Sequence, residues 1–369
     1  MFKDIIKGIY KDKFARIAFF VLVFIYFCLF FADIIAPYTK DYTDRQLSYV
    51  PPSPIFTIDE NGKFSRPYTY NYKREYDEEL MQNPGWRRRY QEELMQTVFK
   101  LDRSKKYYLK FFARGEEYDF LGVISMNRHL VTVDSDGRLY LLGGDINGRD
   151  VFSRLLFGGR ISMTIGFLAL LVLFPIGLLY GGISGYFGGI IDTIMMRFAE
   201  AVMSIPSFYL LIILAAILPS NMTSTQRLIL IVVILALIGW AGFARVVRGM
   251  VLSIKNQEFV QSAKMVGASN LRIIIREILP QTTSYVIVAM TLSVPSYILS
   301  ESGLSFLGLG IQQPDASWGN MLKEAQEYIN ILYRPWLLTP GFLIFVAVLS
   351  FNLIGDTIRD VLDPKSRMR

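Results

Sequence analysis

Six long runs without a charged residue constrain this 369-residue chain more than any other feature of its sequence. They contain 16 to 31 residues each and cover 17–32, 161–191, 201–226, 228–244, 278–300 and 335–355. A helix that crosses a bilayer needs about 20 apolar residues, within a range of roughly 17–25. Charged residues make up 19% of the chain and its mean hydropathy is +0.33. The sequence therefore predicts six transmembrane helices and excludes a soluble enzyme.

The distribution of basic residues predicts which side of the membrane each connection faces. Fifteen of them precede the first run, separate the fourth from the fifth, or follow the sixth: Lys3, Lys7, Lys11, Lys13, Arg16, Arg245, Arg248, Lys255, Lys264, Arg272, Arg276, Arg359, Lys365, Arg367 and Arg369. The opposite loops, 219–227 and 301–334, hold only Arg227, Lys323 and Arg334. Cytoplasmic loops are enriched in Lys and Arg, so both termini are predicted to be cytoplasmic. The net charge of +7 thus indicates topology rather than nucleic-acid binding.

The sequence lacks the residues needed for a disulfide, a histidine-based metal site or ATP hydrolysis. The single cysteine, Cys28, lies in the first run and excludes an intrachain disulfide. The single histidine, His129, leaves no His-based metal cluster, and we favour a packing or surface role for it over catalysis. No phosphate-binding loop is present, so the chain is not expected to hydrolyse ATP by itself. We predict no catalytic residue and no metal site, and a retained first span rather than a cleaved signal.

The polar segment 37–150 is predicted to form a small α+β module outside the cytoplasm. Glycine-containing turns at 59–62 and 134–137, each between apolar stretches, predict two hairpins. The run 107–112 is a further strand candidate, and the charged stretch 72–99 favours helices. The module suggests either a docking surface for an external protein or a stabilising spacer.

The cytoplasmic loop 258–280 has the pattern of two helices joined by a sharp turn. Gly267 suits the left-handed conformation that ends a helix, and Ser269 or Asn270 can cap the next one. Pro280 marks the point where the next membrane span is predicted to begin. Small residues would let another protein approach the backbone closely: Ser262, Ala263 and Ala268. The alternative is an ordinary amphipathic linker.

This loop resembles the EAA motif of ABC-importer permeases, which reads Glu-Ala-Ala, three residues, Gly, nine residues, then Ile-x-Leu-Pro. Gly267 and Leu279-Pro280 match with the correct spacing, whereas Gln261-Ser262-Ala263 replaces Glu-Ala-Ala and Glu277 stands at the Ile position. The resemblance implies an ATPase-coupling loop made of Gln261, Ser262, Ala263, Lys264, Gly267, Ala268, Ser269, Leu279 and Pro280.

Further signatures resemble the second permease subunit of the dipeptide/oligopeptide/nickel branch. They occur in the right order at 142–154, 159–162, 185–192, 303–310, 317–319 and 352–364, and the resemblance covers about 1–36 and 142–369. The first contains the outer signature residues Asp145, Gly148, Arg149, Asp150, Ser153 and Arg154. Asp150 with Ser153 is predicted to cap a short external helix that leads Leu155–Gly158 into the membrane. The outer module is longer than most members carry.

Some residues within or beside the runs are candidates for the transport pathway. Pro206 and Pro295 are predicted to interrupt the third and fifth spans, which favours a position lining a path over one facing lipid. Arg197, Glu200 and Glu301 are ionisable groups at or near span ends, with pairing or snorkelling at the interface as the alternative. Arg160 is a further candidate for the pathway. Glycines between 177 and 189 would let helices pack closely.

These observations together predict an all-α polytopic membrane protein with six transmembrane helices and a small α+β extracytoplasmic insertion. The expected segments are a cytoplasmic N-terminus 1–16, a first span 17–36, the insertion 37–150, a five-helix core 151–355 with the coupling loop 245–281, and a cytoplasmic tail 356–369.

The resemblance implies a non-catalytic permease subunit of a binding-protein-dependent ABC importer for di- or oligopeptides in the bacterial inner membrane. Implied partners are a homologous permease, two ABC ATPase subunits that bind ATP and Mg, an extracytoplasmic substrate-binding protein and membrane lipid. No cofactor is expected on this chain. The alternatives are a self-contained secondary transporter, which the absence of a clear internal repeat disfavours, and a membrane-tethered receptor.

Overall fold

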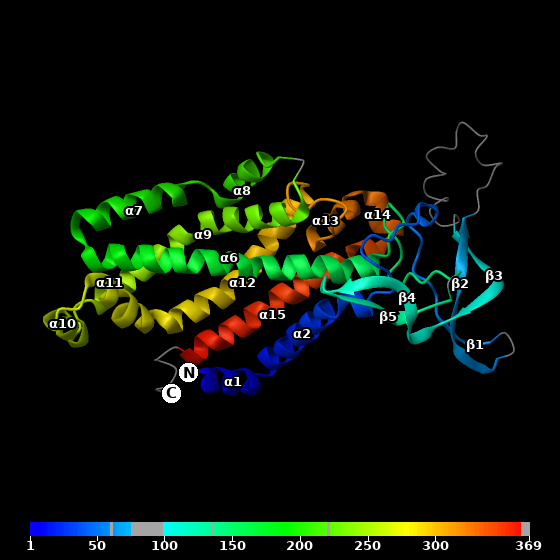
Figure 1. Cartoon of the computed structure of the whole chain (residues 1–369), viewed down its shortest axis with the longest axis horizontal. Helices are drawn as coiled ribbons and strands as arrows, with labels where there is room; N and C mark the ends of the chain where they lie inside the picture. The colour runs from blue at the N-terminus through cyan, green and yellow to red at the C-terminus, as the bar shows by residue number, and fades with distance from the viewer. Residues whose placement is uncertain (60–61, 75–98, 135, 220–221, 363–369) are drawn as a thin grey trace. The chain divides into compact units, whose positions relative to one another are not determined.

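The computed structural model describes residues 1–59, 62–74, 99–134, 136–219 and 222–362, and these are mostly helical with a small region of strands (Figure 1). Five helical stretches among them are long and apolar enough to cross a membrane: Lys13–Phe30, Val151–Phe187, Ser224–Ile254, Asn270–Phe306 and Pro335–Leu362. A bent pair of helices brings the number to six if it counts as one span. The chain is therefore a polytopic membrane protein.

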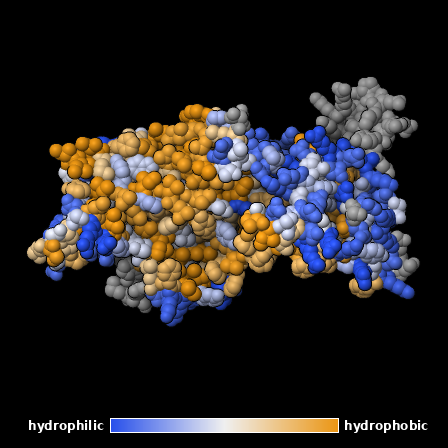
Figure 2. All heavy atoms as spheres, viewed as in Figure 1, coloured by the Kyte–Doolittle hydropathy of each residue, from blue (hydrophilic) through white to orange (hydrophobic). Residues whose placement is uncertain are grey.

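The long helices expose much of their apolar surface. They are α2 (Lys13–Phe30), α6 (Val151–Phe187), α9 (Ser224–Ile254), α12 (Thr283–Phe306) and α15 (Thr339–Leu362). Figure 2 shows hydrophobic side chains over the helices and hydrophilic ones over the strands. Apolar side chains such as Phe20, Phe24 and Leu171 are exposed on these helices, as expected of surfaces that face lipid.

Of the helix interruptions predicted at Pro206 and Pro295, the structure has only the first. The apolar run 201–226 predicts one span, but the structure has α7 (Gly189–Ser204) and α8 (Ser207–Ala216), bent by 78°. Pro206 causes the break, because Ile205 before it adopts an extended conformation. The predicted interruption at Pro295 is wrong, since α12 continues through it. Transmembrane helices tolerate proline where neighbouring groups satisfy the freed carbonyl.

The chain divides into two compact units. The first comprises 1–24, 162–311 and the chain from Ile344 onward. Besides parts of the long helices it contains α1 (Phe2–Lys11), α7, α8, α10 (Glu258–Met265), α11 (Asn270–Arg272), a π-helical turn (Ile273–Ile278) and a 3-10 turn (Leu279–Thr282).

Glycines hold α6 close to α9 in this unit. A Cβ atom at Gly177 would lie 2.5 Å from the Phe243 ring, and one at Gly181 would lie 2.4 Å from the Ala244 carbonyl oxygen. Gly185 follows four residues later, and a Cβ atom there would lie 2.8 Å from the Arg248 carbonyl oxygen. Residues four apart share one helix face, so these three glycines form the contact surface.

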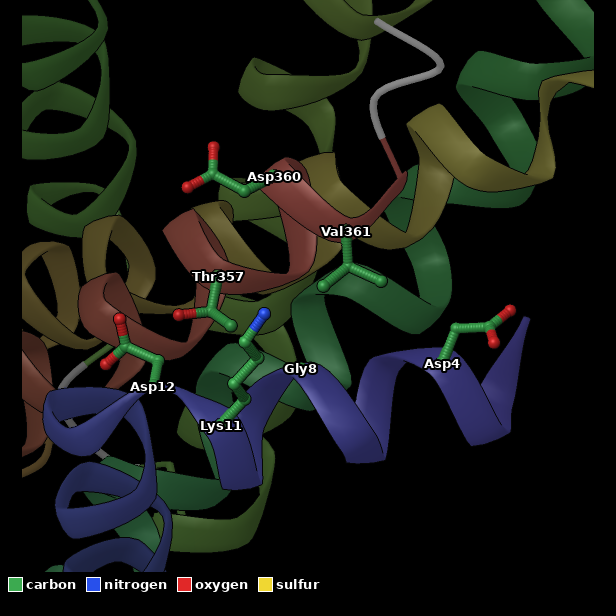
Figure 3. A pocket seen from close by; sticks show the side chains of 7 residues that line it. All are labelled: Asp4, Gly8, Lys11, Asp12, Thr357, Asp360 and Val361. Atoms are coloured by element: carbon green, nitrogen blue, oxygen red, sulfur yellow. The ribbon is translucent and has the colours of Figure 1, made fainter. Parts of the chain in front are cut away.

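The N-terminal segment forms the amphipathic helix α1. The sequence predicts that this segment is cytoplasmic but not that it is helical. Ile5 and Ile9 are buried, whereas Lys3, Lys7 and Lys11 are exposed. Figure 3 shows Gly8 facing Val361 and Thr357 at the end of α15, with the acidic side chains Asp4, Asp12 and Asp360 around the same pocket. A Cβ atom at Gly8 would lie 2.3 Å from Val361, so glycine permits this close approach.

The second unit comprises 25–161 and 312–343 and contains all the described strands. An antiparallel sheet has the order β1 (Phe56–Ile58), β2 (Phe64–Arg74), β3 (Phe99–Tyr108), and a separate hairpin pairs β4 (Lys110–Phe120) with β5 (Ile124–Thr132). Its short helices are α3 (Ala32–Ile35), α13 (Trp318–Leu322), α14 (Tyr328–Tyr333) and the 3-10 turns Arg45–Leu47, Lys323–Gln326 and Pro335–Leu338.

The α+β prediction for the insertion is correct in its strands and wrong in some details. β1 and β2 pair antiparallel, with Gly62 at φ 71°, while residues 60–61 of the predicted turn lie outside the described residues. At the other predicted turn, 134–137, the Gly137 N–H bonds the Asp134 carbonyl at 2.7 Å, and residue 135 lies outside the described residues. Residues 138–142 are not a strand, because the Leu139 and Tyr140 N–H groups bond the Tyr38 and Ser53 side chains instead. The run 107–112 is divided between β3 and β4. The helices predicted within 72–99 fall mainly on residues 75–98, outside the described residues, and their described ends are strand.

Candidate functional site

The loop 258–280 folds as two helical segments around Gly267, as its sequence predicts. The Ala268 N–H bonds the Ala263 carbonyl at 3.1 Å, and the Gly267 N–H bonds the Lys264 carbonyl at 3.0 Å. This pair of bonds is a Schellman motif, which requires a residue with positive φ at its second-last position. Gly267 has φ 81°, and nothing lies within 4 Å of where its Cβ would be. Glycine is therefore needed here for its backbone rather than for space.

The turn presents an apolar tip. Val260 on α10 is fully buried, as are Ile273 and Ile274 of the π-helical turn, on which α10 packs. In contrast, Met265 is 81% exposed and Val266 is 87% exposed. Three of the predicted coupling residues are half-buried, namely Ala263, Ala268 and Leu279. The other six are exposed: Gln261, Ser262, Lys264, Gly267, Ser269 and Pro280. The loop thus exposes small and apolar groups beside the polar side chains of Gln261 and Lys264.

Contacts with the end of α6 hold the loop in place. The Tyr186 hydroxyl donates to Asn270 Oδ1 at 2.9 Å, and Lys264 Nζ lies 5.1 Å from the centre of the Tyr186 ring. Lys255 Nζ donates to the Gly185 carbonyl at 3.0 Å, which satisfies the C-terminus of α6. These contacts join the loop to the end of α6.

An ion pair next to this loop joins three helices. Arg248 of α9 contacts both carboxylate oxygens of Asp192 on α7, at 2.6 and 2.5 Å, and Ser184 of α6 donates to the same carboxylate at 2.5 Å. In the sequence, Arg248 serves only to predict topology. Asp192 directly follows the apolar run 161–191, but the sequence contains nothing that pairs it with Arg248.

The outer signature forms a compact loop around Asp145. Its Oδ1 accepts N–H bonds from Asn147 at 2.8 Å and Arg149 at 3.0 Å, and its Oδ2 lies 2.6 Å from Arg149 Nε and 3.4 Å from Arg154 Nε. Gly148 has φ 70° and packs directly on the Asp44 carbonyl. Asp150 Oδ2 accepts from both the N–H and the hydroxyl of Ser153 at 2.7 Å, which is the predicted cap, although α6 then runs on for 37 residues.

This loop is bonded to a segment far along the chain. Gln313 Oε1 accepts from Arg149 and, at 3.2 Å, from Arg154, while the Ile146 N–H donates to Glu324 Oε2 at 3.0 Å. Trp318 of the Ser-Trp-Gly signature donates to the Leu155 carbonyl at 2.9 Å. The sequence places these signatures in order, but it contains nothing that pairs Glu324 or Gln313 with the loop.

The pathway candidates lie in different settings. Arg160 pairs with Asp33 at 2.6 Å and caps the Leu29 carbonyl at 2.6 Å, whereas Glu200 forms an exposed pair with Arg197 at 2.9 Å. Pro206 is at the bend, and Pro295 is buried within α12. Glu301 is fully buried and accepts from the Ser162 hydroxyl at 2.8 Å and the Ser305 hydroxyl at 2.6 Å.

The Glu324 carboxyl leads to a pH prediction. Burial, and then the charge of Asp145, raises its pKa to about 7 from 4.5. The folded chain therefore binds more protons than the unfolded chain between these values, and stability should fall as pH rises through this window and level off above it. Burial also raises the Asp150 pKa to about 7, which adds to the same trend. Thermal unfolding of the detergent-solubilised chain at a series of pH values measures the slope.

Glu324→Gln should flatten part of that slope, because the amide cannot ionise, and Asp150→Asn should remove most of what remains while still accepting a cap bond. A slope that is unchanged in the double variant would show that other groups cause it.

Comparison with known proteins shows the family of this chain. A family described as "Binding-protein-dependent transport system inner membrane component" matches residues 174–368, which include the loop around Gly267. The chain belongs to this family. A second family, described as the N-terminal TM domain of oligopeptide transport permease C, matches residues 1–52 of this permease.

Curated relatives agree with this family. The permease is 46% identical over 227 residues to the dipeptide transport system permease protein DppC of Bacillus subtilis, covering 61% of this chain and 68% of the relative. It is 42% identical to the oligopeptide transport system permease protein OppC of Haemophilus influenzae, over 62% and 71% of the two chains. The Escherichia coli K12 OppC is 43% identical over 62% and 73%. The predicted family is therefore confirmed.

Proposed function

We propose that this chain is a six-span permease subunit of an ATP-driven, binding-protein-dependent importer of di- or oligopeptides, with both termini in the cytoplasm. In this proposal 17–36 is the first span, 37–150 is extracytoplasmic, and 151–355 is the five-helix core, in which α7 and α8 together count as one span. The observation that carries the proposal is the exposed apolar tip at Met265 and Val266, held by the Schellman turn of a family member.

The proposed mechanism is alternating access driven from the tip. One of two ATPase subunits, which bind ATP and Mg, would receive α10 in a groove, while a homologous permease completes the pathway. Closure of the ATPases would shift α10, and the contacts of Tyr186 and Lys264 would carry the shift into α6. Such coupling requires the tip to bind the open and closed ATPases with different affinity. No bond is made or broken on this chain, and it needs no cofactor of its own.

The proposed cargo follows from the names of the relatives, which are dipeptide and oligopeptide permeases. An external substrate-binding protein would release the peptide into the opened cavity. Uptake of a labelled dipeptide and of a labelled oligopeptide into vesicles containing the assembled complex distinguishes the two cargo classes.

Gly267→Val should uncouple ATP hydrolysis from uptake. A β-branched residue at φ 81° is strained by about 1–3 kcal/mol, so the turn should open while the spans stay inserted. We expect peptide uptake by the assembled complex to fall about tenfold, since each 1.4 kcal/mol changes a population by that factor. Gly267→Asn is the matched variant and should retain most uptake, because asparagine tolerates positive φ.

Equal uptake by the two variants, with normal assembly, would remove the turn from the coupling mechanism. Affinity purification of the detergent-solubilised wild-type chain tests the partners themselves. Stoichiometric ATPase subunits are expected with it. A chain that purifies alone and transports in liposomes without ATP would instead establish a secondary transporter.

A further inference from the structure

We infer that the tip of the β4–β5 hairpin, residues 121–124, is a membrane-inserting wedge that enters the lipid interface beside the end of α2. The partner it fits is the bilayer itself, at the boundary between headgroups and acyl chains. The inference rests on α2 crossing the membrane and is independent of the cargo.

The hairpin is held against the end of the first span. Phe120 makes an edge contact with Phe30, the last residue of α2, at 6.0 Å between ring centres, and stacks on Phe31 at 6.2 Å. The imidazole of His129 on β5 is buried, with Nδ1 2.6 Å from the Ala36 carbonyl oxygen that follows α3. These contacts fix the hairpin tip at the level where the apolar span ends.

The tip itself has the wrong composition for a turn in water. Leu121 and Gly122 have φ values of 52° and 73°, and the Val123 N–H bonds the Phe120 carbonyl at 3.1 Å. Positive φ at both central positions is the pattern of a type I′ turn, which favours Asn-Gly or Asp-Gly. A leucine held in this conformation breaks a local rule, and such violations occur where a side chain serves a function.

The apolar side chains at the tip are also open. Leu121 is 48% exposed, Val123 is 83% exposed and Ile124 is 57% exposed. They continue the exposed apolar surface of α2, where Phe27 and Phe30 point outward. The strands behind the tip carry charged residues instead, among them Glu117, Asp119 and Arg128, and the other exposed aromatics of β4 (Phe111 and Phe112) lie at its opposite end.

A bilayer explains this arrangement better than a protein partner. The ion pair of Asp33 and Arg160 borders the tip, with Asp33 Oδ2 3.5 Å from the Leu121 nitrogen, so the apolar tip lies at the edge of the charged surface. Amphipathic elements lie in the interface with their apolar face buried about 5–10 Å into the headgroup and acyl boundary. Three aliphatic residues on one tight turn match that depth and offer no polar group for a specific partner.

A tryptophan at the tip tests the inference. The full chain carrying Val123→Trp is reconstituted in vesicles of phosphatidylcholine and phosphatidylglycerol, and the emission of the wild-type chain is subtracted. The added emission should be blue-shifted and should be largely lost when the lipids are brominated on their acyl chains. Ile124→Trp gives a second position if the first variant folds poorly.

Phe64→Trp is the matched control, because Phe64 is exposed on the three-stranded sheet. Its emission should be red-shifted, insensitive to brominated lipid and quenched by aqueous acrylamide. The same behaviour at position 123 would place the tip in water and overturn the inference. A blue-shifted emission at 123 that brominated lipid does not quench would overturn it as well, because the tip would then be covered by protein.

Discussion

Gly148→Ala should prevent the outer signature from closing. A Cβ atom at this position would lie 1.8 Å from the Asp44 carbonyl oxygen, and the backbone has φ 70°. The obstacle is backbone, which cannot rotate away as a side chain can. We expect a loss of roughly 2–6 kcal/mol, because a strained backbone and an overpacked contact each cost about 1–3 kcal/mol. The midpoint of thermal unfolding in detergent measures it.

Gly62→Ala separates the two causes. Gly62 has φ 71°, but nothing lies within 4 Å of its Cβ position, so this variant should show the backbone strain alone. The difference between the two midpoints then reports the contact with Asp44. If both variants unfold at the same temperature, the signature loop does not pack on Asp44 as described.

Gly181→Ala should separate α6 from α9. Its Cβ would lie 2.4 Å from the Ala244 carbonyl oxygen and 2.8 Å from the Val247 Cβ, both on α9. Overpacking of this kind costs about 1–3 kcal/mol, and the shift would also disturb the bonds from Ser184 and Arg248 to Asp192. The yield of monodisperse chain in detergent and its thermal midpoint should both fall.

Gly249→Ala on α9 provides a control of opposite sign. No atom lies within 4 Å of its Cβ position, and alanine favours a helix over glycine by about 1 kcal/mol. This variant should therefore be as stable as the wild type or more stable. A Gly181→Ala variant that behaves in the same way would contradict the close packing of α6 on α9.

The loop around Gly267 shows how much of the structure the sequence can predict. Its turn follows from one glycine between two helical patterns, and the cap at Asp150 follows from the spacing to Ser153, because both depend on neighbouring residues. The apolar runs likewise predict the long helices, since lipid imposes a fixed length.

What the sequence could not predict depends on contacts between distant residues. The sequence predicts an interruption at Pro206, but not the 78° angle between α7 and α8, which both contact the distant helix α9. The segment 138–142 has strand composition, yet its N–H groups find side-chain acceptors on Tyr38 and Ser53 instead of a neighbouring strand. The pairing of Asp192 with Arg248 likewise depends on helix rotation, which a single chain does not reveal.

The bond from Arg149 to Gln313 also has a consequence for biosynthesis. Its two residues are 164 positions apart, and the charged signature loop is buried only once the later segment has arrived. A ribosome adds about 5–20 residues per second, so the nascent loop waits roughly 8–33 seconds for its partner. During that interval Asp145, Arg149 and Arg154 remain hydrated, and the unfinished chain offers its outer half to proteases and chaperones. Synthesis of the segment that contains Gln313 therefore sets the earliest time at which the signature loop can reach its final structure.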